Sequence, residues 1–395
     1  MNKKIKKLKS FDVEKKTVLV RCDFNVPFND EGEIEDDFRI KKVLPTIKYL
    51  IENRAQVVLM SHLGRPNGKR IEKYTLRLVA ERLGELLDQE VQLTPDCTSR
   101  KTKSMVKDLN PGDVLLLENV QFHPGEKEAD PEYAKSLASL GDIFILEAFG
   151  QSHRDYASIS GISEFIPAGA GLLLEKELDN LDKARNPENH PYTVILGGAK
   201  LSTKVELVKK ILKKCDHFLF GGKVANILLR AKGLSIGKLI PEGDEDVQED
   251  VKEIDLTNPK IHLPTDVVVG LILPPEKIER ESGPGSVRQE EAILDIGPET
   301  VSMFEKIINE SETILWNGPL GYFEKDEFAE GTKEIAEIIG KNKDALKIVG
   351  GGDSVYALGK FGLRDNFDHV STGGGAMLSY IAGEDLPGIE ALKVS

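Results

Sequence analysis

The chain has 395 residues, of which 40% are hydrophobic and 30% are charged, and this is typical of a soluble globular protein of two domains. Its net charge of −13 argues against binding to nucleic acid or to a membrane surface. No apolar run reaches the ~18 residues that a membrane-spanning helix needs. The three cysteines show no paired spacing, which predicts core residues in a cytoplasmic protein.

Short apolar runs alternate with amphipathic helical patterns along the whole chain. The runs that predict strands are Val18–Val20, Val57–Met60, Val114–Leu117, Ile143–Leu146, Val194–Leu196, Phe218–Phe220, Val267–Val269, Ile314–Trp316, Ile348–Val349 and Val370. Between them, stretches such as Thr75–Leu87 and Lys204–Leu212 have helical spacing. This alternation predicts an α/β fold with doubly wound, Rossmann-like parallel sheets, whose ligands bind beyond the carboxyl ends of the strands.

One longer helix is expected near the middle of the chain. Leu174, Leu178 and Leu181 have helical spacing, which predicts a helix that begins just after Gly171. Pro187 disfavours helix at the residue before it, so the helix should end there. We therefore predict a first domain over residues 1–170, a hinge helix and linker over 171–188, and a second domain over 189–376.

Basic side chains follow the predicted strands of the first half. They are Arg21, Arg39, His62, Arg65, His123, His153 and Arg154. The arginine fork donates two parallel hydrogen bonds and so suits a carboxylate or a phosphate. A single arginine is more often a surface residue, but several at strand ends predict a site for a small anion.

Glycine-rich corners follow four predicted strands of the second half. They are Gly197-Gly198-Ala199-Lys200, Gly221-Gly222-Lys223, Gly350-Gly351-Gly352-Asp353-Ser354 and Thr372-Gly373-Gly374-Gly375-Ala376. Glycine lets the backbone approach a ligand closely, and a helix start offers free N–H groups to an anion. Corners of this kind along one sheet edge predict a binding site for a polyphosphate, which would face the anion site of the first half.

The common nucleotide and zinc motifs are absent from the sequence. There is no G-x-x-x-x-G-K-[ST], no G-x-G-x-x-G after a strand, no protein-kinase catalytic loop and no paired C-x-x-C. Lys200 and Lys204 lie on one face of a helix start, either as a solvated pair or as cations directed at phosphate oxygens. Asp353 either caps its helix or holds Mg²⁺ on a substrate phosphate. Glu324 could accept hydrogen bonds from ribose hydroxyls, although a lone exposed glutamate is usually solvated.

The chain resembles the phosphoglycerate kinase family over essentially its full length. The segments that carry the resemblance are Arg21–Pro27, Asp37–Ile40, Ser61–Pro66, Leu117–Pro124, Ala148–Gly150, His153-Arg154, Leu196–Lys200, Asp295–Pro298, Trp316–Pro319, Phe323-Glu324, Gly350–Ser354 and His369–Ala376. The resemblance implies that residues 1–170, joined by about 377–395, bind a triose phosphate and that residues 189–376 bind the nucleotide. The long helix beginning near Leu172 and the two facing sites predict closure about a hinge.

The resemblance carries over a set of site residues. The implied substrate-binding residues are Asp23, Asn25, Arg39, His62, Arg65, Gln121 and Arg154. The implied catalytic residues are Arg39, Lys200, Gly352 and Gly375. The implied nucleotide-binding residues are Gly198, Ala199, Lys204, Asn317, Pro319, Glu324, Gly351, Gly352, Asp353 and Ser354. Asp353 would hold Mg²⁺, which enters as Mg-ADP or Mg-ATP, and we expect a monomer.

The sequence departs from the family pattern at several of these places. The differences are Gln121 for an arginine, Tyr156 for a histidine, Leu146-Glu147 for Asn-Asp, Lys223 for a glycine, and Leu271–Pro275 for a charged stretch. Glutamine brings neither charge nor fork, so Gln121 predicts weaker triose binding. Alternatively, another basic side chain such as Lys127 supplies the missing charge.

The function predicted from the resemblance is reversible, Mg-dependent phosphoryl transfer between 1,3-bisphosphoglycerate and ADP, giving 3-phosphoglycerate and ATP, the glycolytic reaction. The alternative, motivated by Gln121 and Tyr156, is a nucleotide-binding relative with weakened triose turnover. A kinase for a different small carboxylate also stays open.

Overall fold

The computed structural model describes residues 4–198, 205–239, 251, 253–271 and 278–393. The chain divides into two units, with Met1–Asp179 and Asp385–Ser395 in unit 1 and Asn180–Glu384 in unit 2. The division along the chain thus falls inside the expected hinge helix. Residues 377–384, which we expected with the first domain, belong to unit 2.

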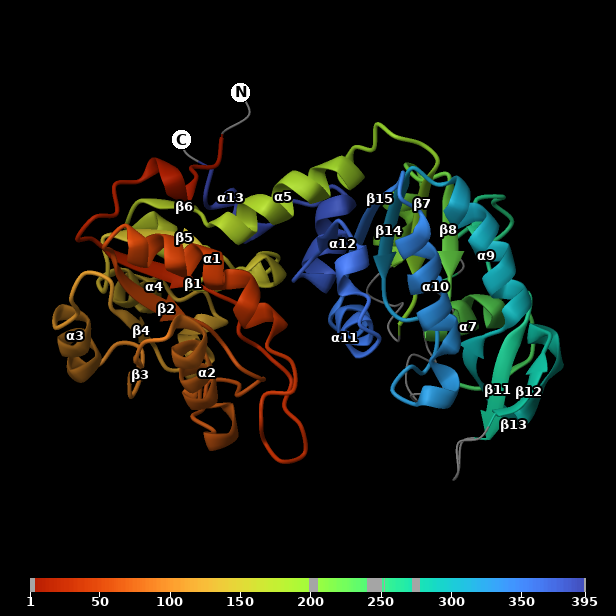
Figure 1. Ribbon diagram of the computed structural model, residues 1–395, viewed down its shortest axis with the longest axis horizontal. Helices are drawn as coiled ribbons and strands as arrows, with labels where there is room; N and C mark the ends of the chain where they lie inside the picture. The colour runs from red at the N-terminus through yellow and green to blue at the C-terminus, as the bar shows by residue number, and fades with distance from the viewer. Residues whose placement is uncertain (1–3, 199–204, 240–250, 252, 272–277, 394–395) are drawn as a thin grey trace. The chain divides into compact units, whose positions relative to one another are not determined.

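Unit 1 is built on a six-stranded parallel sheet with the strand order β3-β4-β2-β1-β5-β6 (Figure 1). Its strands are β1 (Thr17–Arg21), β2 (Gln56–Met60), β3 (Val91–Leu93), β4 (Val114–Leu116), β5 (Ile143–Leu146) and β6 (Ala168–Ala170). Its helices are α1 (Phe38–Glu52), α2 (Arg77–Leu87), α3 (Arg100–Lys107), α4 (Pro131–Ala138) and α13 (Pro387–Glu390). The strands are continuous apolar runs because helices cover both faces of such a sheet.

The helices of unit 1 bury regularly spaced apolar residues against this sheet. Ile40, Val43 and Ile47 of α1 have helical spacing and belong to one core cluster with Val20 of β1 and Leu59 of β2. The chain also returns at its C-terminal end, where Lys393 forms a bridge with Ile5. The predicted strands and parallel sheet of the first half are therefore confirmed.

Unit 2 contains a second six-stranded parallel sheet with the order β10-β8-β7-β14-β15-β16. Its strands are β7 (Tyr192–Leu196), β8 (His217–Phe220), β10 (Ile261–His262), β14 (Thr313–Asn317), β15 (Leu346–Gly350) and β16 (His369–Val370). The helices of unit 2 are α6 (Val205–Leu212), α7 (Gly222–Ala231), α9 (Pro298–Glu310), α10 (Glu330–Lys341), α11 (Gly352–Lys360) and α12 (Gly374–Ile381). Two doubly wound α/β units were predicted, and the fold class is confirmed.

A four-stranded sheet in unit 2 was not predicted. It has the order β12-β11-β13-β9, formed by β9 (Ile236–Lys238), β11 (Val267–Leu271), β12 (Ile278–Ser282) and β13 (Val287–Ile296). We expected the run Val267–Val269 in a parallel sheet, and this was wrong, because β11 pairs antiparallel with both β12 and β13. An apolar run predicts a buried strand, but it does not indicate whether the neighbouring strands are parallel or antiparallel to it.

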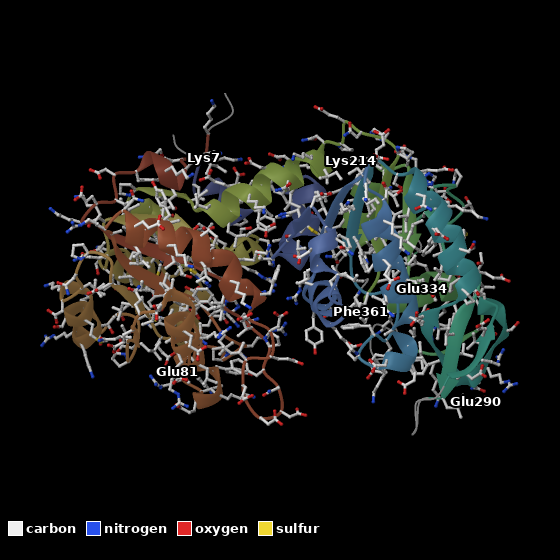
Figure 2. All side chains as sticks on the ribbon, viewed as in Figure 1. Lys7, Glu81, Lys214, Glu290, Glu334 and Phe361 are labelled. Carbon is white, nitrogen blue, oxygen red and sulfur yellow. The ribbon has the colours of Figure 1, made fainter. Side chains whose placement is uncertain are left out.

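The predicted central helix is α5 (Leu172–Arg185), and both of its ends are held by ionisable side chains. At its start, the buried Glu147 carboxylate accepts hydrogen bonds from the Leu173 and Leu174 N–H groups (3.0 and 2.8 Å) and from the Thr46 hydroxyl. Burial raises the pKa of Glu147 to about 7 despite these hydrogen bonds. At the other end, the Lys214 ammonium, labelled in Figure 2, donates to the Arg185 carbonyl oxygen (2.9 Å). A cation there interacts favourably with the helix dipole.

Charged side chains cover the surface of both units, and labelled examples such as Glu81 on α2 and Glu290 on β13 are exposed (Figure 2). Cys22, Cys97 and Cys215 are free and buried, as we predicted for core residues. Within the described ranges, no helix combines the length and apolar character needed to cross a membrane.

Candidate active site

In unit 1, polar residues gather where β1 and β2 end. These strands are parallel neighbours, so their carboxyl ends lie at the same sheet edge. Asp23 follows β1 and is only 4% exposed. Arg39, in the first turn of α1, places Nη1 3.3 Å from both Asp23 carboxylate oxygens. His62, just after β2, has Nδ1 3.8 Å from Asp23 Oδ1. The structure thus brings together three of the predicted substrate-binding residues.

The charges in this cluster follow from burial and from its neighbours. Burial raises the pKa of Asp23, but the fields of Arg39, His62 and Arg21 outweigh it, so this pKa is lowered overall. Burial lowers the pKa of His62 to about 4, with an opposing effect from Asp23. At neutral pH the site therefore holds an ionised Asp23 beside a neutral His62 imidazole, whose buried Nδ1 has no hydrogen-bond partner in the described structure.

Asn25 joins Arg39 of α1 to the loop that carries Arg65. Its Oδ1 accepts from the Gly64 N–H (2.8 Å), and its carbonyl oxygen accepts from Arg39 Nη1 (3.0 Å). Arg65, next to Gly64, is exposed, as is Arg154. The two exposed guanidinium groups can reach a ligand in solution without displacing a partner from the core.

Two residues expected at the anion site have structural roles instead. Arg21 is fully buried, with Nε donating to Ser158 Oγ (2.7 Å) and Nη2 lying 3.8 Å from Glu126 Oε1. Its inclusion among the ligand-binding arginines was wrong, because the last side chain of β1 lies in the core. His123 Nδ1 accepts from the Gly125 N–H (3.1 Å), and the ring stacks on Tyr133 with centroids 4.0 Å apart.

Gln121 is nearly buried, with 4% of its surface exposed, and its Oε1 has no hydrogen-bond partner. It belongs to a 3-10 helix, η3 (Val120–Phe122), and its N–H donates to Asn119 Oδ1 (3.0 Å). His153 is partly buried, and burial together with the field of Arg154 lowers its pKa. The field of Asp23 also acts on His153, which the sequence placed among the basic residues of the anion site.

In unit 2, the glycine corners lie at the carboxyl ends of adjacent parallel strands. The helices α7, α11 and α12 begin at Gly222, Gly352 and Gly374, as predicted. The first corner is described only as far as Gly198; the predicted residues Ala199, Lys200 and Lys204 lie outside the described residues. The shared sheet edge follows from the parallel pairing of β8, β7, β14, β15 and β16.

Asn317 and Ser354 hold these corners together. Asn317 Nδ2 donates to the Gly350 carbonyl oxygen (3.0 Å), and the Gly318 N–H donates to Ser354 Oγ (2.7 Å). Both side chains are buried. Gly351 adopts φ +104°, a conformation that side chains rarely allow, and this turns the chain sharply into α11. These two predicted nucleotide residues thus position the backbone of the loop.

The two predicted catalytic glycines, Gly352 and Gly375, face open space. A Cβ atom added to Gly352 or Gly375 would meet no heavy atom within 4 Å. Both residues lie in the first turns of their helices, where N–H groups lack intrahelical partners. The structure leaves room for an anion at both helix starts.

A pocket of about 250 Å³ adjoins this edge. Its lining includes the predicted residues Gly198, Pro319, Glu324 and Asp353. Its apolar lining includes Pro264, Val267, Ile293, Leu294, Ile296 and Leu320. An apolar slot with a few polar groups at its edge is typical of a site for a flat organic ring.

The residues of β13 in this pocket were missed as site residues, although Asp295–Pro298 belongs to the segments that carry the family resemblance. Asp295 is buried and accepts from the Gly331 and Ile296 N–H groups (2.8 and 2.9 Å). Burial raises the pKa of Asp295 to about 8, so its carboxyl is largely neutral at pH 7. Its position could not be found from the sequence pattern because β13 belongs to the unpredicted sheet.

Glu324 and Asp353 are the exposed acidic groups of the pocket. Partial burial and the charge of Asp353 both raise the pKa of Glu324. Among the described residues, no group of three or more potential ligands could hold a metal on protein side chains alone. A single carboxylate fits Mg²⁺, which commonly binds one or two carboxylates together with substrate phosphates.

A family model described as phosphoglycerate kinase matches residues 8–384. The chain belongs to the phosphoglycerate kinase family. Curated phosphoglycerate kinases from Pseudothermotoga lettingae and Dictyoglomus turgidum are 44% and 42% identical to it, over 98% and 99% of both chains.

Solved structures agree with this family assignment. A phosphoglycerate kinase from Pyrococcus horikoshii matches with a TM-score of 0.89 and 36% identity, over 98% of each chain. One from Coxiella burnetii matches with a TM-score of 0.80 and 38% identity, over 98% of this chain and 99% of that one. Membership of the phosphoglycerate kinase family makes this chain a phosphotransferase of glycolysis, and the alternative of a nucleotide-binding relative with weakened triose turnover is not favoured.

Proposed function

We propose that unit 1 binds 3-phosphoglycerate or 1,3-bisphosphoglycerate, that unit 2 binds Mg-ATP or Mg-ADP, and that a phosphoryl group passes reversibly between them. The observation that carries this proposal is the row of glycine-started helices at one edge of the unit 2 sheet, with open space at Gly352 and Gly375. Helix starts of this kind bind phosphate groups through backbone N–H donors.

The chemistry explains why the site needs no general base. A carboxylate oxygen of 3-phosphoglycerate attacks the γ-phosphorus, the bond from phosphorus to the β,γ-bridging oxygen breaks, and ADP leaves with the electron pair. The carboxylate is already ionised at neutral pH, so no proton has to be removed. What the reaction needs is alignment and positive charge around the transferred group.

In unit 1, we assign binding of the triose to the predicted set of polar side chains. The set is Asp23, Asn25, Arg39, His62, Arg65, Gln121 and Arg154. The neutral imidazole of His62 and the carboxylate of Asp23 suit hydroxyl groups, whereas Arg39, Arg65 and Arg154 suit the acidic groups. Arg39, 25% exposed and anchored on Asp23, also stabilises charge on the moving phosphoryl group.

In unit 2, we assign the phosphates to the helix starts at Gly352 and Gly375 and to Lys200 and Lys204. The apolar pocket takes the base, Glu324 takes the ribose hydroxyls, and Asp353 holds Mg²⁺. When bound, Mg²⁺ neutralises negative charge on the phosphates. Gly198, Ala199, Pro319 and Gly351 shape the backbone around the nucleotide, and Asn317 and Ser354 hold that backbone in place.

We further propose a monomeric cytoplasmic enzyme whose two units close during the reaction. Closure would exclude water, which otherwise hydrolyses an acyl phosphate. The expected absence of nucleic-acid and membrane partners rests on the charge of −13.

A coupled assay with 3-phosphoglycerate and MgATP tests the proposal, with Lys200→Ala as the variant. Wild type should turn over and should stop when EDTA removes Mg²⁺. Lys200→Ala should lose about 10²–10³ in kcat, as expected when one stabiliser of transition-state charge is removed, with little effect on nucleotide binding. Absence of turnover in wild type would contradict the function, and an unchanged kcat in the variant would contradict the role of Lys200.

A further inference from the structure

Lys127 follows Glu126, a buried residue whose hydrogen bonds hold this loop against the core. The preceding residue, Glu126, is buried and accepts from the Ser158 N–H (3.0 Å) and hydroxyl (2.6 Å), with Arg21 Nη2 at 3.8 Å. These contacts fix the backbone at the end of the 3-10 helix η4 (Pro124–Glu126). Lys127 itself is exposed. Its ammonium group therefore extends from a rigid position into solvent.

This ammonium group meets the loop that carries Arg65. Lys127 Nζ donates to Asn67 Oδ1 (2.9 Å). One residue further on, the Gly68 N–H donates to the Gln121 carbonyl oxygen (3.1 Å). Gly68 also packs against Pro124, because a Cβ atom added to Gly68 would lie 3.0 Å from the Pro124 Cα. The Arg65 loop, Gln121 and Lys127 thus form one packed corner of the proposed triose site.

The same corner lacks a charge where the family has arginine. Gln121 is nearly buried, its Oε1 has no hydrogen-bond partner, and an amide carries no charge. In the part of the chain that the structure describes, Lys127 has no carboxylate partner to neutralise it. The positive charge of Lys127 also helps to lower the pKa of the His62 imidazole.

We propose that Lys127 is a substrate-binding residue that contacts an acidic group, phosphate or carboxylate, of the triose and supplies the charge that Gln121 lacks. The inference rests on the proposed function of unit 1. The ammonium has three donors, so it binds an anion while Asn67 keeps it at the corner. A hydrogen bond between charged groups is stronger than the one that a neutral glutamine amide could offer the same anion.

Calorimetric titration with 3-phosphoglycerate tests this role without requiring turnover. Lys127→Met should weaken the Kd for 3-phosphoglycerate by about tenfold or more and leave the Kd for MgATP unchanged. Lys127→Arg keeps the charge and should stay close to wild type. Lys135→Met, an exposed lysine on α4 of the same unit, is the matched control and should have no effect.

The double variant Lys127→Met with Gln121→Arg separates a ligand contact from a structural role. An arginine at 121 should restore most of the lost affinity in the Lys127→Met background. An unchanged Kd in Lys127→Met, or a loss that Gln121→Arg does not restore, would overturn the role of Lys127. Wild type that neither binds nor turns over 3-phosphoglycerate would overturn the proposed function itself, and this inference with it.

Discussion

Two arginines of unit 1 show how burial decides the role of a single residue. Arg21 ends β1 and is enclosed by Ser158 and Glu126, so it stabilises the core. Arg39 lies in the first turn of α1, is 25% exposed, and keeps one face toward solvent while Asp23 orients it. The sequence places both beside strand ends, but only the packing around each guanidinium separates a structural arginine from a ligand-binding one.

His62 gives a prediction about the pH dependence of stability. Its folded-state pKa of about 4 lies below the ordinary value of 6.5, so the unfolded chain binds more protons between these pH values. The stability that comes from the neutral imidazole is therefore present above pH 6.5 and is lost as the pH falls toward 4. From pH 7 to pH 5, this group alone should lower the free energy of unfolding by about 2 kcal/mol.

Urea unfolding of wild type and His62→Gln at pH 7 and pH 5 measures this effect. The variant lacks the titrating group, so its loss of stability between the two pH values should be smaller by that amount. Equal losses in the two proteins would show that His62 is protonated at its ordinary pKa.

At the scale of elements, α5 depends on a contact far from it in sequence. Glu147 follows β5 and accepts from the Leu173 and Leu174 N–H groups, which have no intrahelical partners. Gly171 precedes the helix and lies against the Glu147 side chain, so a Cβ at this position would clash with the Glu147 carboxyl group. The departure from the family pattern at Glu147 thus serves as a helix cap.

Replacement of Glu147 with alanine should destabilise the protein by about 2 kcal/mol, because it removes the cap and leaves buried donors without acceptors. Lys183→Ala, at an exposed position of the same helix, should change stability by less than about 0.5 kcal/mol. Thermal and urea unfolding of both variants checks this. A Glu147→Ala protein as stable as Lys183→Ala would mean that water or another group caps α5 equally well.

At the scale of the whole molecule, the proposed reaction requires ligands of two different units to meet. Unit 1 holds the proposed triose residues and unit 2 the nucleotide pocket, and α5 carries the chain from one to the other between Asp179 and Asn180. Transfer of a phosphoryl group needs the reacting atoms within about 3–3.5 Å of each other. We therefore propose that the two units close during turnover.

Small-angle X-ray scattering should detect this closure as a smaller radius of gyration. We expect the decrease with 3-phosphoglycerate and MgATP together and little change with either alone, because only the full set of ligands supplies contacts that favour the closed state. A radius of gyration that is the same with both ligands as without them would refute closure, while leaving the assignment of the two sites intact.

The amino-acid pattern predicted the two parallel α/β sheets, the position of α5 and the sheet edges at which the polar residues gather. These follow from local patterns: apolar strands, helical spacing and glycine corners such as Gly350–Gly352, which require little beyond their own segment. Long-range packing sets the antiparallel sheet around β11, the burial of Arg21, the cap from Glu147 and the place of Lys127 beside Asn67. Each of these depends on which distant segments pack together, and neither the period of a sequence nor the type of a residue contains that information.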